Sequence, residues 1–430
     1  MSDTTSFTTL DEWLHFIETL HSKAIDLGLE RMQTMLKRME IRFSCPVITV
    51  GGTNGKGSTC NCMEQILLSQ GYKVGVHTSP HLIRFNERAR INGSFVSDEE
   101  LIRHFKKVEE ARKELTLSYF EYTLLGILSL FKEKDLDVLI LEIGLGGRLD
   151  AVNTVESDAA IVTSIGIDHV AFLGDTREKI GWEKAHIYRK GKPAVCADPE
   201  PPLTLVEFAE NLGSDFITYG RDYSFFRGGQ EPSWSYDFRG THFFKLPLPA
   251  LEGEHQLRNA AGAITVLLSL QDKLPVSEEA ICSGLRRMEV TGRFQKVSEN
   301  PEIILDVGHN PHAAKELAKT LNVHPVTGRK IAVMGMLKDK DRAQVCRILS
   351  QSFDFWFLAD LWGPRGGSAC ELKEFLLEVG VQEDRILCFD NVENAVKASI
   401  NMADSTDTIV VLGSFLTVTG ALQYLHLSVK

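Results

Sequence analysis

The stretch Ile48–Asn61, ITVGGTNGKGSTCN, passes from an apolar run into a segment with four glycines, one lysine and two adjacent hydroxyl side chains. The β-branched residues 47–50 predict a buried strand, and the helical spacing of later apolar residues predicts a helix that ends at Gly71. Such a turn gathers backbone N–H groups at the positive end of a helix dipole, and Lys56 adds a full charge. The stretch therefore predicts an anion site that suits a triphosphate.

This loop departs from the common phosphate-loop pattern G-x-x-x-x-G-K-[ST]. Val50 stands where the first glycine would be, and Gly57 separates Lys56 from Ser58. The alternative is an ordinary glycine-rich turn with one exposed lysine. We favour the phosphate loop, because a lysine between two glycines and before two hydroxyls has little structural purpose.

The composition is that of an acidic globular protein. With 430 residues, 43% hydrophobic and 24% charged, the chain can form about two or three domains with ordinary cores. A formal net charge of −11 argues against a nucleic-acid-binding surface. The opening MSDTTSFTTLDEW lacks signal-peptide features, no apolar run approaches the roughly 20 residues of a membrane span, and the cysteines are scattered. We expect a cytoplasmic monomer without nucleic-acid or membrane partners.

Strand-like apolar runs alternate with helical patterns, which is typical of an α/β fold with a mostly parallel sheet. Between Phe216 and Leu248 the chain is rich in aromatics, glycine and alternation, which predicts antiparallel hairpins attached to the sheet. The α/β alternation begins again after VTGRFQKV. We predict a P-loop-containing, mostly parallel sheet domain with a small appended antiparallel sheet over residues 1–290, and a smaller Rossmann-like α/β domain over residues 295–430.

Polar residues follow several predicted strands. LDVLILE ends in Glu142, KVGVHTSPH contains Ser79, and AAIVTSIGIDH leads to Asp168 and His169. Ligands of open α/β sheets bind at the carboxyl ends of the strands. Magnesium prefers oxygen ligands, so Ser79 and Glu142 are candidate ligands beside phosphate oxygens. His169 is a less usual magnesium ligand, and we include it because it coincides with Glu142 and a phosphate loop.

Ten motifs occur in order along nearly the whole chain: GTNGKGS, HTSPHL, YFEY, LEIGLGGRLDAVN, IDHV, HQLRNAA, GRFQ, LDVGHNPHA, GMLKDKD and GSFLTV. Together they resemble the folylpolyglutamate synthase/dihydrofolate synthase family, which is related to the Mur ligases. The resemblance implies a ligase that uses ATP and two Mg²⁺ ions to join a carboxylate to the amine of L-glutamate through an acyl phosphate. Catalysis would then depend on positioning and charge stabilisation.

The resemblance also implies roles for individual residues. Ser79 and Glu142 match the ligands of one magnesium, and His169 matches a ligand of the second. Lys184, in WEKAHI, matches a lysine that is carbamylated in the family and so offers anionic oxygens. The residues that match phosphate and nucleotide contacts are Thr53, Asn54, Gly55, Lys56, Gly57, Ser58, Asn259, Arg293 and Asp306.

The loop DVGHNPH follows the predicted strand EIILD. Asp306 matches a residue that faces the nucleotide, and His309 matches a position at the glutamate-binding cleft between the domains. From the residues alone, this loop is equally a polar cap of the next helix. Ser414 is likewise a helix cap or a cleft residue. The candidate catalytic residues are Lys56, Glu142, His169, Lys184, Asp306 and His309.

The acceptor is the remaining question, because family members either lengthen folate glutamate tails only or also make dihydrofolate from dihydropteroate. AIDLGLERM resembles the loop that covers dihydropteroate in the bifunctional members, although it also fits a helix start with a solvated Glu30–Arg31 pair. We favour the bifunctional enzyme over a monofunctional folylpolyglutamate synthase. The implied pterin contacts are Ile25, Asp26, Leu27, Ser118, Tyr119, Phe120, Glu121, Leu149, Asp150 and Ala151.

Two other classes of protein use a phosphate loop. A GTPase-like switch needs a guanine-reading N/T-K-x-D segment, and the nearest candidate, LKDKD, begins with leucine. A small-molecule kinase needs only Mg·ATP and an acceptor, as a ligase does. The kinase releases a stable phosphorylated acceptor, whereas the ligase releases phosphate only when an amine is present.

Overall fold

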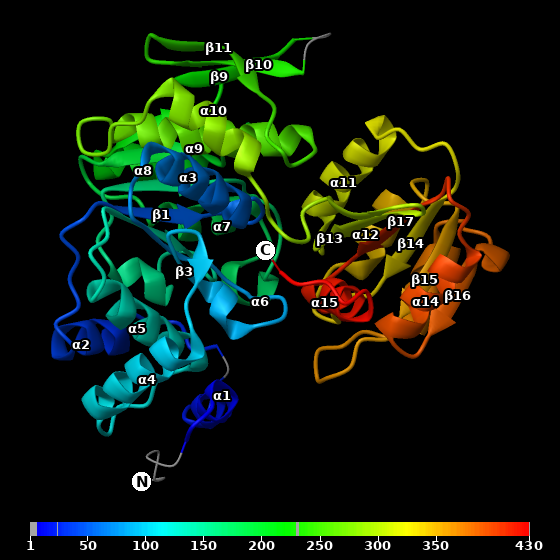
Figure 1. Ribbon diagram of the computed structural model, residues 1–430, viewed down its shortest axis with the longest axis horizontal. Helices are drawn as coiled ribbons and strands as arrows, with labels where there is room; N and C mark the ends of the chain where they lie inside the picture. Colours follow the sequence, from blue (N-terminus) through cyan, green and yellow to red (C-terminus); the bar gives the residue numbers. More distant parts are fainter. Residues whose placement is uncertain (1–6, 24, 229–231, 430) are drawn as a thin grey trace.

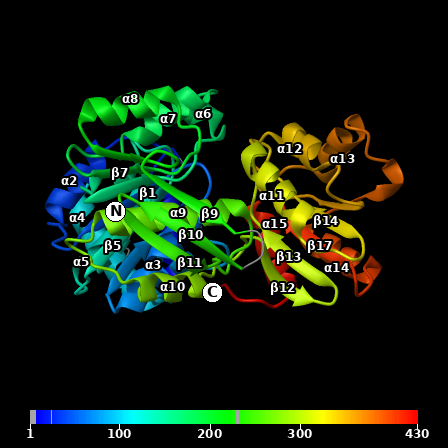
Figure 2. The same cartoon turned by 90° about the horizontal axis from the view of Figure 1, so that it is seen from above.

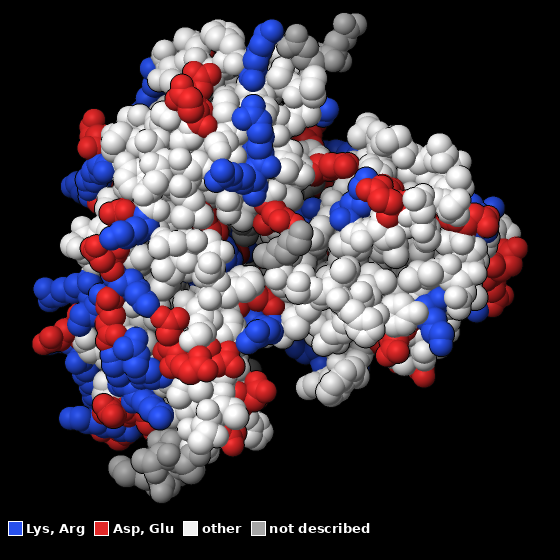
Figure 3. All heavy atoms as spheres, viewed as in Figure 1, with Lys and Arg blue, Asp and Glu red and all other residues white. Residues whose placement is uncertain are grey.

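The computed structural model describes residues 7–23, 25–228 and 232–429. Two α/β lobes lie side by side, the first drawn in blue to green and the second in yellow to red (Figure 1). The view from above shows the same two bodies (Figure 2), so their separation is not an effect of one projection. Basic and acidic side chains are interspersed over the face in Figure 3.

The first lobe contains an eight-stranded sheet made of β1 (Val47–Gly51), β2 (Val74–His77), β3 (Ala89–Ile91), β4 (Ser94–Phe95), β5 (Val138–Glu142), β6 (Ala159–Val162), β7 (Pro193–Cys196) and β8 (Asp215–Thr218). Its order is β4-β3-β2-β5-β1-β6-β7-β8. The strands from β2 to β8 in that order are parallel, and β3 and β4 form an antiparallel edge. The mostly parallel sheet predicted from the sequence is confirmed.

Helices cover both faces of this sheet: α1 (Leu10–Thr19), α2 (Glu30–Arg38), α3 (Lys56–Gln70), α4 (Asp98–Arg112), α5 (Tyr119–Lys132), α6 (Val170–Leu173), α7 (Arg177–Ala185), α8 (Leu203–Leu212), α9 (Glu254–Ser269) and α10 (Glu278–Arg287). Residues of α3, α9 and α10 share one hydrophobic core with the sheet, and residues of α1, α2, α4, α5, α7 and α8 share the other.

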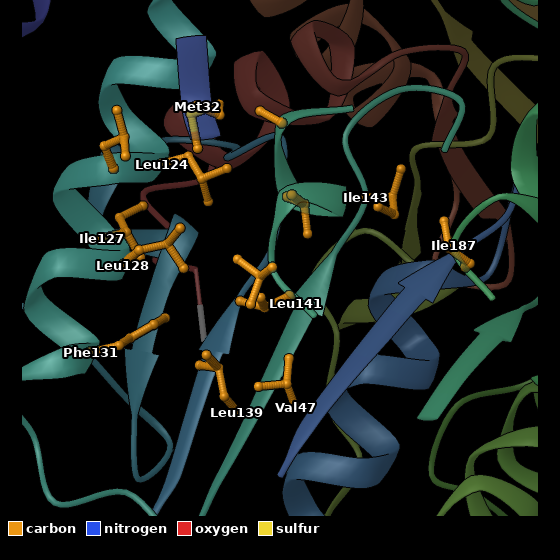
Figure 4. Close-up of a cluster of buried hydrophobic side chains, with 14 of the residues drawn as sticks. Met32, Val47, Leu124, Ile127, Leu128, Phe131, Leu139, Leu141, Ile143 and Ile187 are labelled. Carbon is orange, nitrogen blue, oxygen red and sulfur yellow. The ribbon is translucent and has the colours of Figure 1, made fainter. Parts of the chain in front are cut away.

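The strand β5 shows how the sequence pattern builds two cores. All five of its residues are buried, because both faces of a parallel sheet are covered. Leu139 and Leu141 point to the side of α5, where they lie in one core with Leu128 (Figure 4). Val138 and Ile140 point the other way, into the core formed with α3 and α9. A continuous apolar run is therefore the expected sequence of this strand.

A small antiparallel sheet with the order β11-β10-β9 is attached to this lobe; its strands are β9 (Tyr223–Arg227), β10 (Ser233–Phe238) and β11 (Thr241–Pro247). It packs on α9, where the Tyr236 hydroxyl lies 2.7 Å from Thr265 Oγ1. The antiparallel sheet was predicted, but the predicted segment begins too early. Phe216 and Ile217 belong to β8, which is parallel to β7, because their side chains enter opposite cores of the large sheet.

The second lobe has a six-stranded sheet with the order β12-β13-β17-β14-β15-β16. Only β12 is antiparallel to its neighbour. Helices α11, α12 and α13 cover one face, and α14 and α15 cover the other, as expected for a Rossmann-like fold. The elements are β12 (Gln295–Glu299), β13 (Glu302–Asp306), α11 (Pro311–Val323), β14 (Lys330–Met334), α12 (Arg342–Leu349), β15 (Phe355–Ala359), α13 (Ala369–Glu378), β16 (Ile386–Phe389), α14 (Val392–Met402), β17 (Thr408–Leu412) and α15 (Phe415–Tyr424).

A loop of the first lobe docks on the second. Leu82 and Ile83, which follow β2, pack against the core beside α15. The Thr419 hydroxyl of α15 donates a hydrogen bond to the carbonyl oxygen of Leu82 at 2.8 Å. The domain limits at residues 290 and 295 stay predictions. Over residues 7–23, 25–228 and 232–429, no helix has the length and apolar character that a membrane span requires.

Gly284 lies on α10 where that helix crosses α3. A Cβ atom on Gly284 would lie 2.6 Å from the backbone nitrogen and Cα of Ile66. We expect Gly284→Ala to lower the free energy of unfolding by about 1–3 kcal/mol, because overpacking would force the two helices apart. Denaturant-induced unfolding followed by circular dichroism measures this change.

The matched control is Ser283→Ala, because Ser283 precedes Gly284 on the same helix and is only half-buried. Alanine is the better helix former at both positions, so helix propensity alone predicts no loss of stability in either variant. A Gly284→Ala protein as stable as its parent would contradict the close crossing of α3 and α10.

Candidate active site

A cavity of about 440 Å³ lies between the lobes, lined by residues that follow β1, β2, β5 and β6 and by loops of the second lobe. This is the carboxyl-end edge where parallel sheets bind ligands. The predicted site residues that line it are Ile25, Asp26, Leu27, Thr53, Asn54, Gly55, Lys56, Ser79, Ser118, Phe120, Glu121, Glu142, Leu149, Asp150, Ala151, His169, Lys184, Arg293 and His309.

A smaller cavity of about 70 Å³ shares the phosphate loop with the larger one. The predicted residues in its lining are Asn54, Gly55, Ser58, Asn259, Arg293 and Asp306. Two predicted residues, Gly57 and Tyr119, are absent from the linings of both cavities as far as the described residues define them.

The phosphate loop connects β1 to α3, and its geometry depends on close packing. Gly55 is the N-cap of α3 with φ +87°, and a Cβ there would lie 2.4 Å from Asn259 Oδ1. Lys56 Nζ donates hydrogen bonds to the carbonyl oxygens of Gly52 and Thr53 at 3.2 and 3.3 Å. The loop therefore curls around its own lysine, and the helix N-terminus and the ammonium group lie together.

Ser79, Glu142 and His169 have the chemistry of ligands for a divalent cation. Glu142 is buried, which raises the pKa of its carboxyl, while the charge of Lys56 opposes that rise. The Ser79 N–H donates a hydrogen bond to Glu142 Oε2 at 3.1 Å. Burial lowers the pKa of His169 to about 4, so its ring is neutral at pH 7 and able to bind a metal.

The protein side chains alone do not form a closed metal cage. Across the part of the chain that the structure describes, no group of three or more His, Cys, Asp or Glu side chains is placed to hold a metal ion. Ser79 and Glu142 therefore fit one Mg²⁺ ion and His169 fits a second, each ion taking its other ligands from phosphate and water, as magnesium commonly does.

Lys184 is buried on α7 beside the phosphate loop. Its Nζ donates a hydrogen bond to the carbonyl oxygen of Gly52 at 3.0 Å. Burial, reinforced by the charge of Lys56, lowers the pKa of Lys184 to about 7. A large neutral fraction therefore exists at pH 7, and the neutral amine is the form that adds CO₂ to become a carbamate. The predicted carbamate has the chemistry it needs and stays a prediction.

Asp306 and Arg293 bring the second lobe to the smaller cavity. The Asp306 carboxylate accepts hydrogen bonds from the N–H groups of Phe294 and Gly308 at 3.1 and 2.7 Å, so it fixes the two loops on either side of it. Arg293 Nε is buried and has no hydrogen-bond partner within the described residues. The Nε–H group of Arg293 is therefore available to donate to an anionic ligand. Asn259, in the lining of the same cavity, donates from Nδ2 to Gln256 Oε1 at 3.0 Å.

Asp168 connects the lobes across the larger cavity. Lys340 Nζ lies 2.6 Å from Asp168 Oδ1, and His309 Nε2 lies 3.5 Å from Asp168 Oδ2. Burial by itself would raise the pKa of this carboxyl, but the contact with His309 and the charge of Lys340 hold it well below its usual range. Lys340 was not among the site residues predicted from the sequence. The motif GMLKDKD was its only signal.

The residues predicted to contact the pterin form a wall that ion pairs hold together. The Asp26 carboxylate lies 3.0 Å from His21 Nε2 and 2.8 Å from Arg31 Nη1. Arg31 Nε in turn donates to both carboxylate oxygens of Glu121 at 3.0 Å. Glu121 also forms a capping box with Ser118, the N-cap of α5. Ser118 and Glu121 therefore have structural roles in addition to any contact with substrate.

Tyr119 is one of the predicted pterin contacts, and it does not belong to the lining of the larger cavity as the described residues define it. As the first residue of α5 it packs on the ring of Phe85, and the Arg88 guanidinium lies 5.8 Å from its ring centroid. Arg88 does line the larger cavity, and its Nε donates to His81 Nδ1 at 2.9 Å. Ser414 is both the buried N-cap of α15 and a cavity residue, so the two alternatives for it are compatible.

Comparisons with known proteins follow the same division of the chain. The Mur ligase middle domain matches residues 50–267, and the Mur ligase glutamate ligase domain matches residues 292–415. The dihydrofolate synthase/folylpolyglutamate synthase of Escherichia coli (strain K12) is 44% identical over 416 residues, which cover 96% of this chain and 95% of that protein. The chain belongs to the dihydrofolate synthase/folylpolyglutamate synthase family.

Solved structures of this family have the same fold. E. coli FolC in complex with DHPP and ADP superposes with a TM-score of 0.92 at 43% identity, covering 97% of this chain and 98% of that one. A bifunctional folylpolyglutamate synthase/dihydrofolate synthase with Mn, AMPPNP and L-glutamate bound gives 0.90 at 43% identity, covering 98% of each chain.

The carbamate at Lys184 can be tested by substitution. We expect Lys184→Ala to lose most ligase activity and to regain part of it with added short carboxylic acids, because a carboxylate replaces the missing anionic oxygens. Turnover measured against acetate or formate concentration gives the rescue.

Lys179→Ala is the control, since Lys179 lies on the same helix but is exposed and paired with Asp175. It should keep the parent's activity and show no rescue. If the activity of Lys184→Ala stays equally low at every acid concentration, Lys184 acts without a carbamate.

Proposed function

We propose that this chain is an ATP-dependent ligase that adds L-glutamate to dihydropteroate and to the glutamate tail of tetrahydrofolate. The observation that carries the proposal is the single cavity of about 440 Å³. Its lining contains the phosphate loop with Lys56 and also Asp26 and Asp150, which the resemblance assigns to the pterin. Transfer of a phosphoryl group from ATP to a substrate carboxylate requires both reactants in one such space.

Family membership supports the bifunctional form of the reaction. The E. coli relative with 44% identity has both activities in its name, so a monofunctional folylpolyglutamate synthase is not favoured. The relatives solved with ADP and DHPP, and with Mn, AMPPNP and L-glutamate, support ATP, a divalent metal ion and glutamate as the other participants here.

The reaction has two steps and needs no covalent bond to the protein. An oxygen of the substrate carboxylate bonds to the γ-phosphorus of ATP while the bond to the β–γ bridging oxygen breaks, which yields an acyl phosphate and ADP. The neutral amine of glutamate then attacks the acyl carbon, loses a proton and displaces inorganic phosphate. Charge stabilisation and orientation are what the protein contributes.

The residues of this chain divide that work by position. The N–H groups of the phosphate loop and the ammonium group of Lys56 hold the phosphates. Arg293 adds its Nε from the junction of the lobes, where that atom has no partner among the residues that the structure describes. Ser79 and Glu142 would hold one Mg²⁺ ion and His169 a second, and the ions neutralise phosphate charge when bound. His309, beside Asp168, faces the larger cavity from the second lobe and would orient glutamate.

A product assay tests the proposal. The purified chain is incubated with ATP, Mg²⁺, glutamate and either dihydropteroate or tetrahydrofolate, and the products are weighed by mass spectrometry. We expect each acceptor to gain glutamyl mass and phosphate release to depend on glutamate. A phosphorylated acceptor that accumulates without glutamate would indicate a kinase instead. Activity on tetrahydrofolate alone would indicate the monofunctional enzyme. The monomeric state and the cytoplasmic location stay predictions.

A substitution at Asp26 tests whether the loop around it selects between the two acceptors. We expect Asp26→Ala to reduce kcat/KM more for dihydropteroate than for tetrahydrofolate, by up to about a hundredfold, because a lost hydrogen-bond acceptor costs roughly 1–3 kcal/mol. The substitution removes the partner of His21 and Arg31 and so loosens the loop at the cavity wall. Initial rates with each acceptor at varied concentration measure the difference.

Glu30→Ala is the matched control, because Glu30 is an exposed acid four residues along the chain. It should leave the ratio of the two activities unchanged. If Asp26→Ala reduces both activities equally, the loop supports the fold and does not select the acceptor.

A further inference from the structure

Two cysteines lie next to each other on the surface of the second lobe. All eight cysteines of the chain are among the described residues, and Cys370 and Cys388 are the exposed ones. Cys370 is in the first turn of α13, and Cys388 is on β16, the edge strand of the sheet. The proposed ligase reaction gives neither thiol a role.

The strand pattern explains why the two side chains meet. Cys388 lies two residues after Ile386, so both side chains point to the same face of the sheet. Ile386 packs there with Ala369 and Leu372 of α13. Cys388 Sγ donates a hydrogen bond at 3.7 Å to the carbonyl oxygen of Ala369, the residue that precedes Cys370, and the nearby Cys370 side chain acts on the pKa of Cys388.

The surroundings distinguish the two thiols. Burial raises the pKa of Cys388, and the neighbouring Cys370 raises it further, while Lys373 acts in the opposite direction. Cys370 lies in the first turn of α13 and is exposed, so a hydroperoxide can reach its sulfur from solvent. Lys373, one turn along the same helix, interacts electrostatically with both sulfurs. Cys370 is therefore placed as the attacking sulfur and Cys388 as its partner.

We propose that Cys370 and Cys388 form a reversible dithiol–disulfide site that responds to hydroperoxides. The Cys370 thiolate attacks one oxygen of the peroxide, the O–O bond breaks, and a sulfenic acid and an alcohol or water result. The Cys388 thiol then attacks that sulfur, and water leaves as the S–S bond forms. In balance, two thiols are oxidised and one hydroperoxide is reduced. A small thiol in excess reverses the step by exchange.

The site connects to the larger cavity through the segment that precedes α13. The Ala369 N–H donates to Asp360 Oδ1 at 2.7 Å, and the Gly367 N–H donates to the carbonyl oxygen of Met336 at 3.1 Å. Arg365, two residues before Gly367, lines the larger cavity, and its Nη2 lies 2.8 Å from Asp339 Oδ2. A disulfide between Cys370 and Cys388 would draw the first turn of α13 toward β16, and this would shift the preceding segment, which carries Arg365.

Peptide mapping tests the disulfide directly. The purified full chain is treated with hydrogen peroxide, alkylated, and digested with trypsin without reduction. Cleavage after Arg365, Lys373, Arg385 and Lys397 releases residues 366–373 and 386–397. We expect these two peptides to be found joined, with the mass of two hydrogens lost, and to separate after dithiothreitol.

Three results would overturn the proposal: both thiols alkylated after peroxide, Cys370 oxidised to sulfinic acid without a link, or a link between two chains instead of within one. Cys370→Ser and Cys388→Ser should each abolish the joined peptides. Cys282→Ser, at a half-buried cysteine, is the matched control and should leave them unchanged.

The effect on catalysis is the second readout, and this part rests on the proposed ligase function. We expect the oxidised enzyme to show a severalfold higher KM for the folate substrate than the reduced enzyme, because Arg365 lines the larger cavity. Cys388→Ser should not respond to peroxide. An unchanged folate KM in fully linked enzyme would refute the coupling. Peptide mapping does not depend on ligase activity, so a failure of the proposed ligase function can be told apart from a failure of the disulfide proposal.

Discussion

The arrangement of the two lobes depends on an exchange of hydrogen bonds between Asn54 and Asn310. Asn54 Nδ2 donates to Asn310 Oδ1 at 3.1 Å, and Asn310 Nδ2 donates to Asn54 Oδ1 at 3.0 Å. Because Asn310 Oδ1 also caps α11 by accepting from the Ala313 N–H, its amide can face only one way. Its Nδ2 then also reaches Asp168 at 3.1 Å. One pair of amides thus positions the phosphate loop, α11 and the ion pair between Asp168 and Lys340, and both cavities lie around them.

That exchange is possible because the phosphate loop runs unusually close to its neighbours. A Cβ on Gly52 would lie 1.9 Å from Thr163 Oγ1, and the left-handed φ of +141° there would strain any other residue. The Thr163 hydroxyl instead donates to the carbonyl oxygen of Asn54 at 2.6 Å, which holds the asparagine in place. The glycines that first indicated an anion site therefore serve two ends: they free N–H groups for a ligand and let the loop touch β6.

The parts of the site that local patterns encode were predictable from the sequence. Glu142 ends a fully buried strand, and Lys56 stands between glycines, so each carries its signal in its immediate neighbours. Lys340 and Asp168 are 172 residues apart, and no local pattern pairs them. Within the described residues, Tyr119 is absent from both cavity linings while its neighbour Phe120 lines the larger one; adjacent helix residues point about 100° apart, and a motif does not say which one faces the cavity. The predicted roles of individual site residues remain predictions.

The net charge of the chain does not predict which charges line the larger cavity. The chain has a formal net charge of −11, yet Lys56, Lys184, Arg293 and Lys340 all line one cavity. Burying cations together is unfavourable, and the protein shows the cost at Lys184, whose pKa falls to about 7 through burial and the charge of Lys56. Asp168 offsets part of this by pairing with Lys340. Asp26, Glu121, Glu142 and Asp150 also line the cavity, so it is the cations gathered at the phosphate loop, and not the net charge of the cavity, that suit a polyanionic substrate.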